Sequence, residues 1–161
     1  MTDAKKIIVI GGVAGGASFA ARARRIDETA DITIIEKGPY VSFANCGLPY
    51  HIGGAIQDRN MLLLHTPESL AERYNINVRV RCEATAVDSS AKVVTISDLK
   101  TGQTETLPYD ILLLSPGAEA FIPPIPGFDR PNVFALQTLP QMDAIIDWIK
   151  AKQPKHATVV G

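Results

Sequence analysis

A single cysteine, Cys46, stands in the segment VSFANCGLPY, too far from the other cysteine to form a CxxC pair. A thiolate is a nucleophile, and the N-terminus of a helix lowers the pKa of a thiol. We predict a short helix that starts near Asn45 and accommodates Pro49 in its first turn. In that setting one thiol can attack a disulfide or persulfide sulfur and hold the product as a mixed disulfide. A catalytic thiol is therefore one interpretation of Cys46, and a small buried hydrophobe is the other.

A glycine-rich loop separates the first apolar run from a stretch that favours a helix, and its glycines are Gly11, Gly12, Gly15 and Gly16. Glycine lets the backbone turn tightly and approach a pyrophosphate, while the helix N-terminus offers free N–H groups. Glu36 ends the next apolar run, 25 residues after Gly11, where a carboxylate can accept hydrogen bonds from ribose hydroxyls. Val13 replaces the middle glycine of the usual GxGxxG pattern. The pattern predicts dinucleotide binding, and the alternative is a tight strand-to-helix turn without a ligand.

These residues need a βαβ unit to position them, and the first 36 residues have that pattern. A continuous apolar strand, KIIVIGG, precedes a segment rich in Ala and Arg, GGASFAARARRI, which favours a helix. A second strand with β-branched residues follows, DITIIEK. A later helix is predicted from the capping residue Thr66 to about Tyr74.

Between residues 78 and 107 the pattern changes to short strands separated by turn residues, namely VRV, ATAV, VVTIS and TETLP. They predict an antiparallel meander inserted in an α/β chain. A fully apolar buried strand follows in YDILLLSPGA, then a stiff loop, IPPIPG, and an amphipathic helix, PQMDAIIDWIKAK. The last segment, HATVVG, begins another apolar strand and reaches a glycine at Gly161. It predicts that the chain stops at the start of a second nucleotide-binding unit.

The composition excludes several functional classes. The chain has 161 residues, of which 46% are hydrophobic and 20% charged, as is typical of a soluble globular protein. A net charge of −1 argues against a surface for nucleic acid or for an anionic membrane, and no apolar run is long enough to span a bilayer. Two cysteines make no disulfide framework, so we expect the reducing cytoplasm, and we predict no metal site. No motif surrounds Cys82, which is interpreted as a buried structural residue.

Along its whole length the chain resembles the single-cysteine branch of the flavoprotein pyridine nucleotide-disulfide oxidoreductases. The matching segments, in family order, are IGGVAGGAS, IIEKG, YVSFANCGLPYHIGG, LLLSPGA, IPPIPG and HATVVG. That branch includes coenzyme A-disulfide reductases, NADH-dependent persulfide reductases, and NADH oxidases and peroxidases. The resemblance implies a glutathione-reductase-like fold: an α/β, Rossmann-like FAD/NAD(P)-binding fold with a parallel sheet and an inserted antiparallel β-meander, here truncated.

In this family the first glycine loop binds FAD, and a second one binds NADH or NADPH. The resemblance assigns residues 1–153 to the first segment of an FAD-binding domain, with the meander at about 78–107 and an exit linker at about 118–138. It assigns residues 154–161 to the first strand of a truncated NADH-binding domain. The residues that it places at FAD are Gly11, Gly12, Ala14, Gly15, Gly16, Glu36, Lys37, Ala84, Ser115, Pro116 and Gly117.

The resemblance also implies residues that contact the substrate. Ser42 and Asn45 flank the thiol, and in the family they contact the thiol substrate. Ser18, Arg22 and Arg25 share one helix face through their i, i+4, i+7 spacing. The matching helix of the coenzyme A-disulfide reductases carries coenzyme A contacts, and the planar forks of arginine suit phosphate oxygens. The alternative is a solvated basic face.

The resemblance implies an FAD-dependent NAD(P)H:disulfide or persulfide oxidoreductase, a homodimer that uses Cys46 on coenzyme A disulfide, its persulfide or another small thiol. One alternative is an NADH oxidase or peroxidase with a Cys46 sulfenic acid. The other is an inactive nucleotide-binding fragment, which would hold FAD weakly. Ala14 favours the disulfide or persulfide oxidoreductase. The oxidase and peroxidase branch has a histidine at this position, which can assist peroxide chemistry as an acid–base group, and alanine cannot.

Overall fold

The structure is a computed structural model that describes residues 4–160. These residues form two compact units. The first takes the chain up to Ala44 and then Leu63–Gly117, and the second takes Asn45–Leu62 and the chain from Ala118 onward.

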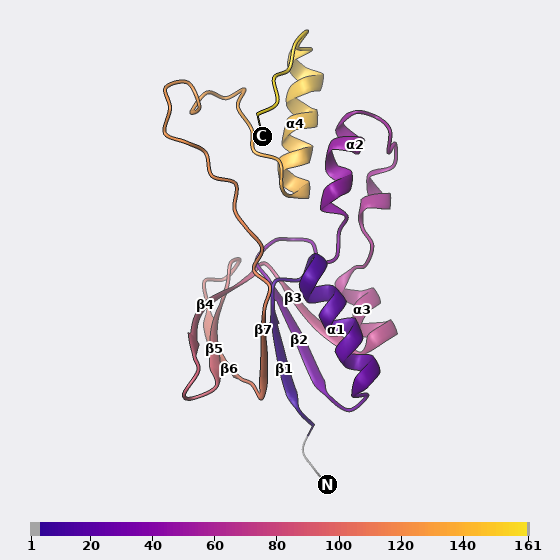
Figure 1. Ribbon diagram of the computed structural model, residues 1–161, viewed down its shortest axis with the longest axis vertical. Coiled ribbons are helices and arrows are strands. Elements are labelled where there is room, and N and C mark those ends of the chain that lie inside the picture. The colour runs from indigo at the N-terminus through magenta and orange to yellow at the C-terminus, as the bar shows by residue number, and fades with distance from the viewer. Residues whose placement is uncertain (1–3, 161) are drawn as a thin grey trace. The chain divides into compact units, whose positions relative to one another are not determined.

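The first unit is built on a four-stranded parallel sheet (Figure 1). Its strands are β1 (Lys6–Ile10), β2 (Asp31–Glu36), β3 (Ile76–Val80) and β7 (Ile111–Leu114), in the order β3-β2-β1-β7. Neighbouring strands run parallel throughout, with Ile8 of β1 opposite Thr33 of β2 and Leu112 of β7. The βαβ unit predicted from the first 36 residues is confirmed, and β1 lies inside the sheet.

Both faces of this sheet are covered, which explains the continuous apolar run of β1. Ile7 and Val9 pack on the side of the helices α1 (Ala14–Ile26) and α3 (Pro67–Tyr74). Ile8 packs on the opposite side, with buried residues of a second sheet. Successive side chains of a strand point to opposite faces, so alternate residues of β1 serve two separate cores.

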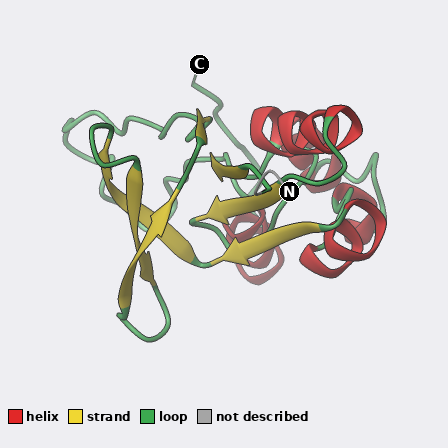
Figure 2. Ribbon diagram, turned by 90° about the horizontal axis from the view of Figure 1, so that it is seen from below, coloured by secondary structure: helices red, strands yellow, loops and turns green. Residues whose placement is uncertain are grey.

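The second sheet is the antiparallel meander, made of β4 (Cys82–Asp88), β5 (Val93–Asp98) and β6 (Thr104–Pro108) (Figure 2). The prediction that it begins at Val78 is wrong, because Val78 lies in β3 and pairs with Ile34 of the parallel sheet. Ile76 at the start of β3 is fully buried and belongs to the same core as Leu70 of α3. The helix α3 therefore leads into β3, which lies at the edge of β2. The antiparallel pairing starts only after the turn at Arg81.

Two further strand predictions differ from the structure. The strand β7 is not fully buried, since Ile111 is 41% and Leu114 is 62% exposed. Among the described residues β7 pairs with β1 alone, so its other edge has no strand partner. The predicted strand HATVVG forms no strand in its described part, residues 156–160, which pair with no strand of the described chain; Gly161 lies outside the described residues.

The second unit is helical. It contains the 3₁₀ turn η1 (Asn45–Gly47), the helix α2 (Leu48–Ile52), a second turn η2 (Arg59–Leu62) and the helix α4 (Leu139–Lys152). The segment between Ala118 and Thr138 has no helix or strand, and α4 begins with a capping box between Thr138 and Gln141. The helices predicted near Asn45, after Thr66 and over PQMDAIIDWIKAK are confirmed.

The first unit also holds a buried arginine that the sequence pattern did not single out. Arg24 is 9% exposed. Its guanidinium donates to the carbonyls of Tyr74 at 2.9 Å, Asn75 at 2.8 Å and Glu28 at 2.7 Å. These bonds join the end of α1 to the end of α3, so the side chain satisfies carbonyl groups at two helix termini.

We expect Arg24→Ala to lower the free energy of unfolding by about 2–4 kcal/mol, since it leaves several carbonyls without their donors. Arg22→Ala, an exposed arginine on the same helix, is the matched control and should change it by less than about 0.5 kcal/mol. Urea unfolding followed by circular dichroism measures both. Equal losses in the two variants would contradict a structural role for Arg24.

Candidate functional site

The glycine loop is a place where backbone segments approach each other closely. Gly11 has φ +89°, a conformation that favours glycine, and its N–H donates to the carbonyl of Ile35 at 2.8 Å. A Cβ atom on Gly11 would lie 2.0 Å from the Ser115 carbonyl oxygen. A Cβ atom on Gly16 would lie 1.7 Å from the Gly11 carbonyl oxygen. The fold itself therefore requires these two glycines at the joint between β1, β2, β7 and α1.

The first turn of α1 suits an anion. Its N-cap, Val13, makes no side-chain cap hydrogen bond, and the first turn contains no acidic residue. The N–H groups of this turn therefore keep their capacity to donate, at the positive end of the helix dipole. Ala14 and Gly15 are exposed here, and a Cβ atom on Gly15 would come within 2.5 Å of the Ser115 hydroxyl oxygen.

The Glu36 carboxylate connects the end of β2 to the glycine loop. Its Oε2 accepts from the Gly12 N–H at 2.7 Å, and its Oε1 accepts from the Gly38 N–H at 2.7 Å. Gly12 packs closely, since a Cβ atom there would lie 2.8 Å from Val41 and 2.9 Å from Ile34. An ionised carboxylate has about four acceptor positions, so two of them remain for a ligand. The structure thus places Glu36 beside the glycine loop, and its bonds from Gly12 and Gly38 are contacts that the sequence pattern did not indicate.

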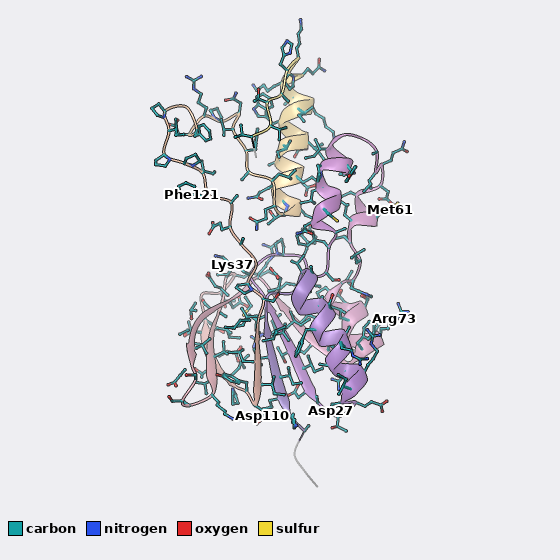
Figure 3. The ribbon with its side chains drawn as sticks, in the orientation of Figure 1. Asp27, Lys37, Met61, Arg73, Asp110 and Phe121 are labelled. Atoms are coloured by element: carbon teal, nitrogen blue, oxygen red, sulfur yellow. The ribbon has the colours of Figure 1, made fainter. Side chains whose placement is uncertain are left out.

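The remaining residues predicted at the cofactor lie in the same unit. Lys37 forms an ion pair with Glu83 at 2.9 Å (Lys37 is labelled in Figure 3). Ala84 is half-buried in β4, where the pairing with β5 is irregular. Ser115 follows β7, and its N–H donates to the Ile10 carbonyl at 2.8 Å. Pro116 and Gly117 come next in the chain, and Gly117 has φ +74°.

Ser42 has an unusual backbone conformation for a residue that is not glycine. Its φ is +48° and it is only 7% exposed. Its N–H donates to the Gly12 carbonyl at 2.8 Å, and its own carbonyl accepts from the N–H groups of Leu64 at 2.9 Å and His65 at 3.3 Å. The glycine loop and the chain after Leu63 thus meet at Ser42. Sequence reasoning missed this role, because no residue pattern signals a positive φ at serine.

The three residues predicted to share a face of α1 do so. Ser18, Arg22 and Arg25 are all exposed. Arg25 donates through Nε to the Ala21 carbonyl at 3.2 Å, one turn earlier on the helix.

The two cysteines have opposite environments. Cys46 lies in η1 of the second unit and is exposed, and its N–H donates to the Asn45 side-chain oxygen at 3.0 Å. Cys82 lies in β4 of the first unit, is 3% exposed, and burial raises the pKa of its thiol. Both thiols are free. The structure assigns Cys46 and Asn45 to a different unit from the glycine loop, Glu36 and Ser42.

Other kinds of site are not found in the described range 4–160. Its His, Cys, Asp and Glu residues form no cluster that could hold a metal ion. No helix within this range has the length and apolar character needed to cross a bilayer.

Comparisons with known proteins identify the family of this chain. A family model described as pyridine nucleotide-disulphide oxidoreductase matches residues 5–161, and the chain belongs to that family. A coenzyme A disulfide reductase of Staphylococcus aureus (strain JH9) is 42% identical over 156 residues, which are 97% of this chain and 35% of that protein. The chain therefore spans about a third of the length of this relative.

Two solved structures are similar in both fold and sequence. The reduced Bacillus anthracis CoADR-RHD is 45% identical with a TM-score of 0.92, over 95% of this chain and 28% of that one. An NAD-dependent persulfide reductase from A. fulgidus is 35% identical with a TM-score of 0.87, over 91% of this chain and 27% of that one. The predicted fold class, with its parallel sheet and separate antiparallel sheet, is confirmed.

We expect Cys46 to react at least about tenfold faster than Cys82 with iodoacetamide at pH 7, because Cys46 is exposed while burial and a raised pKa keep Cys82 as a thiol. Mass spectrometry of partly labelled folded protein gives both rates, and Cys46→Ser should leave only the slow one. Labelling in denaturant, where both sites are open, is the control. Equal rates in the folded protein would contradict the expected difference in reactivity between Cys46 and Cys82.

Proposed function

We propose that the complete protein carrying this chain is an FAD-dependent NAD(P)H:disulfide or persulfide oxidoreductase that uses Cys46 as its nucleophile. The proposed substrate is coenzyme A disulfide or coenzyme A persulfide. The observation that supports this most is the exposed free thiol of Cys46, in a chain 42% identical to a coenzyme A disulfide reductase. We also propose that it acts in the reducing cytoplasm, where such a thiol stays reduced, and as a homodimer.

In the proposed reaction the Cys46 thiolate attacks one sulfur of the substrate disulfide. The substrate S–S bond breaks, the first thiol leaves and takes up a proton, and Cys46 remains as a mixed disulfide. FAD, held by the residues named below, would supply the electron pair that this chemistry needs, which NADH or NADPH would provide. With two electrons and one proton, the S–S bond of the mixed disulfide breaks, the second substrate sulfur leaves as a thiol, and Cys46 returns to its thiolate.

The residues of the first unit fit FAD. The glycine loop and the first turn of α1 offer N–H donors for the pyrophosphate, and no acidic side chain lies in that turn. Glu36 keeps two acceptor positions for the ribose hydroxyls while it holds Gly12. The further residues that we assign to FAD are Gly11, Ala14, Gly15, Gly16, Lys37, Ala84, Ser115, Pro116 and Gly117.

Five residues are assigned to the substrate: Ser18, Arg22, Arg25, Ser42 and Asn45. Arg22 and Arg25 have exposed side chains on one face of α1, and their forks can bind pairs of phosphate oxygens. A coenzyme A substrate carries such phosphates, whereas a small uncharged disulfide does not. The competing function, an NADH oxidase or peroxidase, has less support because Ala14 offers no acid–base group beside the loop.

Glu36→Gln should weaken FAD binding by the complete protein. The amide has one acceptor oxygen instead of two, so it cannot accept from both Gly12 and Gly38 and still serve the ribose. The loss should be about 1.5–3 kcal/mol, or roughly ten- to hundredfold in Kd. Flavin fluorescence during titration of the apoprotein measures it, with the exposed Glu68→Gln on α3 as control. Unchanged affinity would argue against a role for Glu36 at the cofactor.

Steady-state kinetics of the complete protein test the substrate. Coenzyme A disulfide should give a higher kcat/KM than peroxide, and Cys46→Ser should reduce kcat by on the order of 10³-fold or more. Arg22→Ala with Arg25→Ala should raise KM for coenzyme A disulfide about tenfold, at roughly 0.5–1 kcal/mol for each exposed contact. An uncharged disulfide should show no such change, and neither should Arg73→Ala on α3. Preference for peroxide would favour the oxidase or peroxidase function instead.

A further inference from the structure

The helix that follows Cys46 is too short to hold its conformation unaided. The helix α2 has five residues, and its N-cap, Gly47, makes no side-chain hydrogen bond. Isolated helices shorter than about 12 residues are marginal in water, so packing must stabilise α2. Leu48, two residues after the thiol, is 1% exposed, and α2 packs against α4. The conformation around Cys46 therefore depends on a helix that lies far downstream in the sequence.

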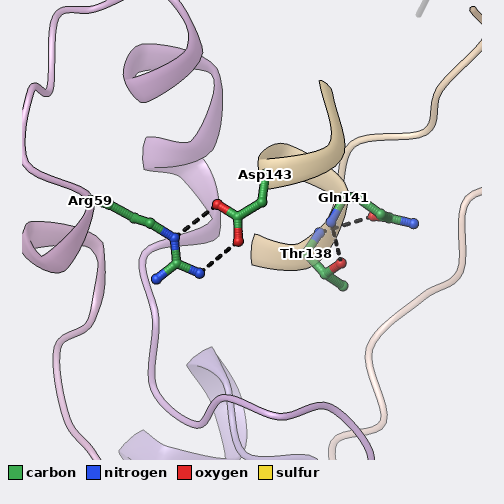
Figure 4. A network of polar contacts seen from close by, with 4 residues as sticks. All are labelled: Arg59, Thr138, Gln141 and Asp143. Carbon is green, nitrogen blue, oxygen red and sulfur yellow. Dashed lines mark hydrogen bonds and ion pairs between the residues drawn. The ribbon is translucent and has the colours of Figure 1, made fainter. Parts of the chain in front are cut away.

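A bidentate ion pair ties the chain after α2 to the same helix (Figure 4). Arg59 donates through Nε to Asp143 Oδ1 at 2.8 Å and through Nη2 to Asp143 Oδ2 at 2.7 Å. Arg59 begins η2, whose last residue, Leu62, is fully buried, and Met142 beside Asp143 is fully buried as well. Two parallel hydrogen bonds fix the orientation of the groups as well as their distance. The packing of α2 and the ion pair of Arg59 thus hold both ends of residues 48–59 against α4.

The charges of this pair persist at neutral pH. The hydrogen bonds from Arg59 lower the pKa of Asp143, and the positive charge of Arg59 acts in the same direction. Burial opposes them only in part. The two side chains are 29% and 38% exposed, so solvent screens the attraction and the pair adds little to global stability. Its effect is expected in local geometry.

We propose that Arg59 and Asp143 are positioning residues for the thiol. Their ion pair holds α2 and η2 against α4, and so keeps the turn η1 in the conformation in which Cys46 presents its sulfur. Both act through the packing of Leu48 rather than on the reacting atoms. The inference rests on the proposed function, because it concerns the same thiol.

Hydrogen–deuterium exchange of this chain, read by mass spectrometry, tests the structural step. Asp143→Asn keeps the shape of the side chain and removes its charge, and Arg59→Gln removes the other charge. Each should speed exchange of the α2 amides about fivefold and leave β1 and β2 unchanged. The double variant should exchange no faster than either single one, because both break the same pair.

Asp147→Asn is the matched control, since Asp147 is an exposed aspartate one turn further along α4. It should leave exchange in α2 unchanged. The pair has no such role if Asp147→Asn equals Asp143→Asn, if the two charge removals add, or if α2 exchanges at the wild-type rate in all variants.

Turnover of coenzyme A disulfide by the complete protein tests the functional step. Asp143→Asn should lower kcat about fivefold and keep KM within about twofold, because it alters the presentation of the thiol and not the phosphate contacts. Cys46→Ser separates this inference from the function on which it rests. If Cys46→Ser is inactive while Asp143→Asn keeps the wild-type kcat, the positioning role alone is overturned. If Cys46→Ser keeps full activity, the proposed function itself fails.

Discussion

The first unit depends on the close approach of backbone segments at Gly11. At this point β1 ends, α1 begins, and the ends of β2 and β7 come within hydrogen-bonding or contact distance. A side chain at Gly11 or Gly16 would collide with backbone atoms, which cannot move aside without separating the strands. The small residues that allow this close approach also leave the N–H groups in the first turn of α1 without side-chain partners. Such N–H groups at a helix N-terminus attract anions. Packing and the proposed cofactor binding therefore demand the same residue type.

Glu36 stabilises the fold, and in the proposed function it also binds a ligand. Its two oxygens accept from Gly12 and Gly38, which holds the loop in place without any ligand. Because these bonds form without a ligand, the loop would already be organised when a nucleotide binds to the remaining acceptor positions in the proposed function. A preorganised site loses less conformational entropy on binding, so more of the contact energy appears as affinity.

The two cysteines have the same side chain but opposite environments, since Cys46 is exposed and Cys82 is buried. Cys82 fills space between two sheets, where burial disfavours the thiolate. Cys46 lies exposed in the turn η1, which contacts α2, and α2 in turn packs against α4. Family membership and the persulfide and disulfide reductases among similar proteins give the exposed thiol its proposed chemistry.

The sequence by itself determined the local features of this protein, because each depends on residues close together in the chain. The βαβ unit, the positions of the glycines, the caps at Thr66 and the meander turns all belong to this class. Tertiary structure alone decided that residues 76–80 join the parallel sheet and that β7 is an exposed edge, since both depend on which strand lies alongside. It also decided the burial of Arg24, the positive φ of Ser42 and the pairing of Arg59 with Asp143. The partners in these cases are distant in sequence, and no local periodicity or propensity records which distant segments folding will bring together.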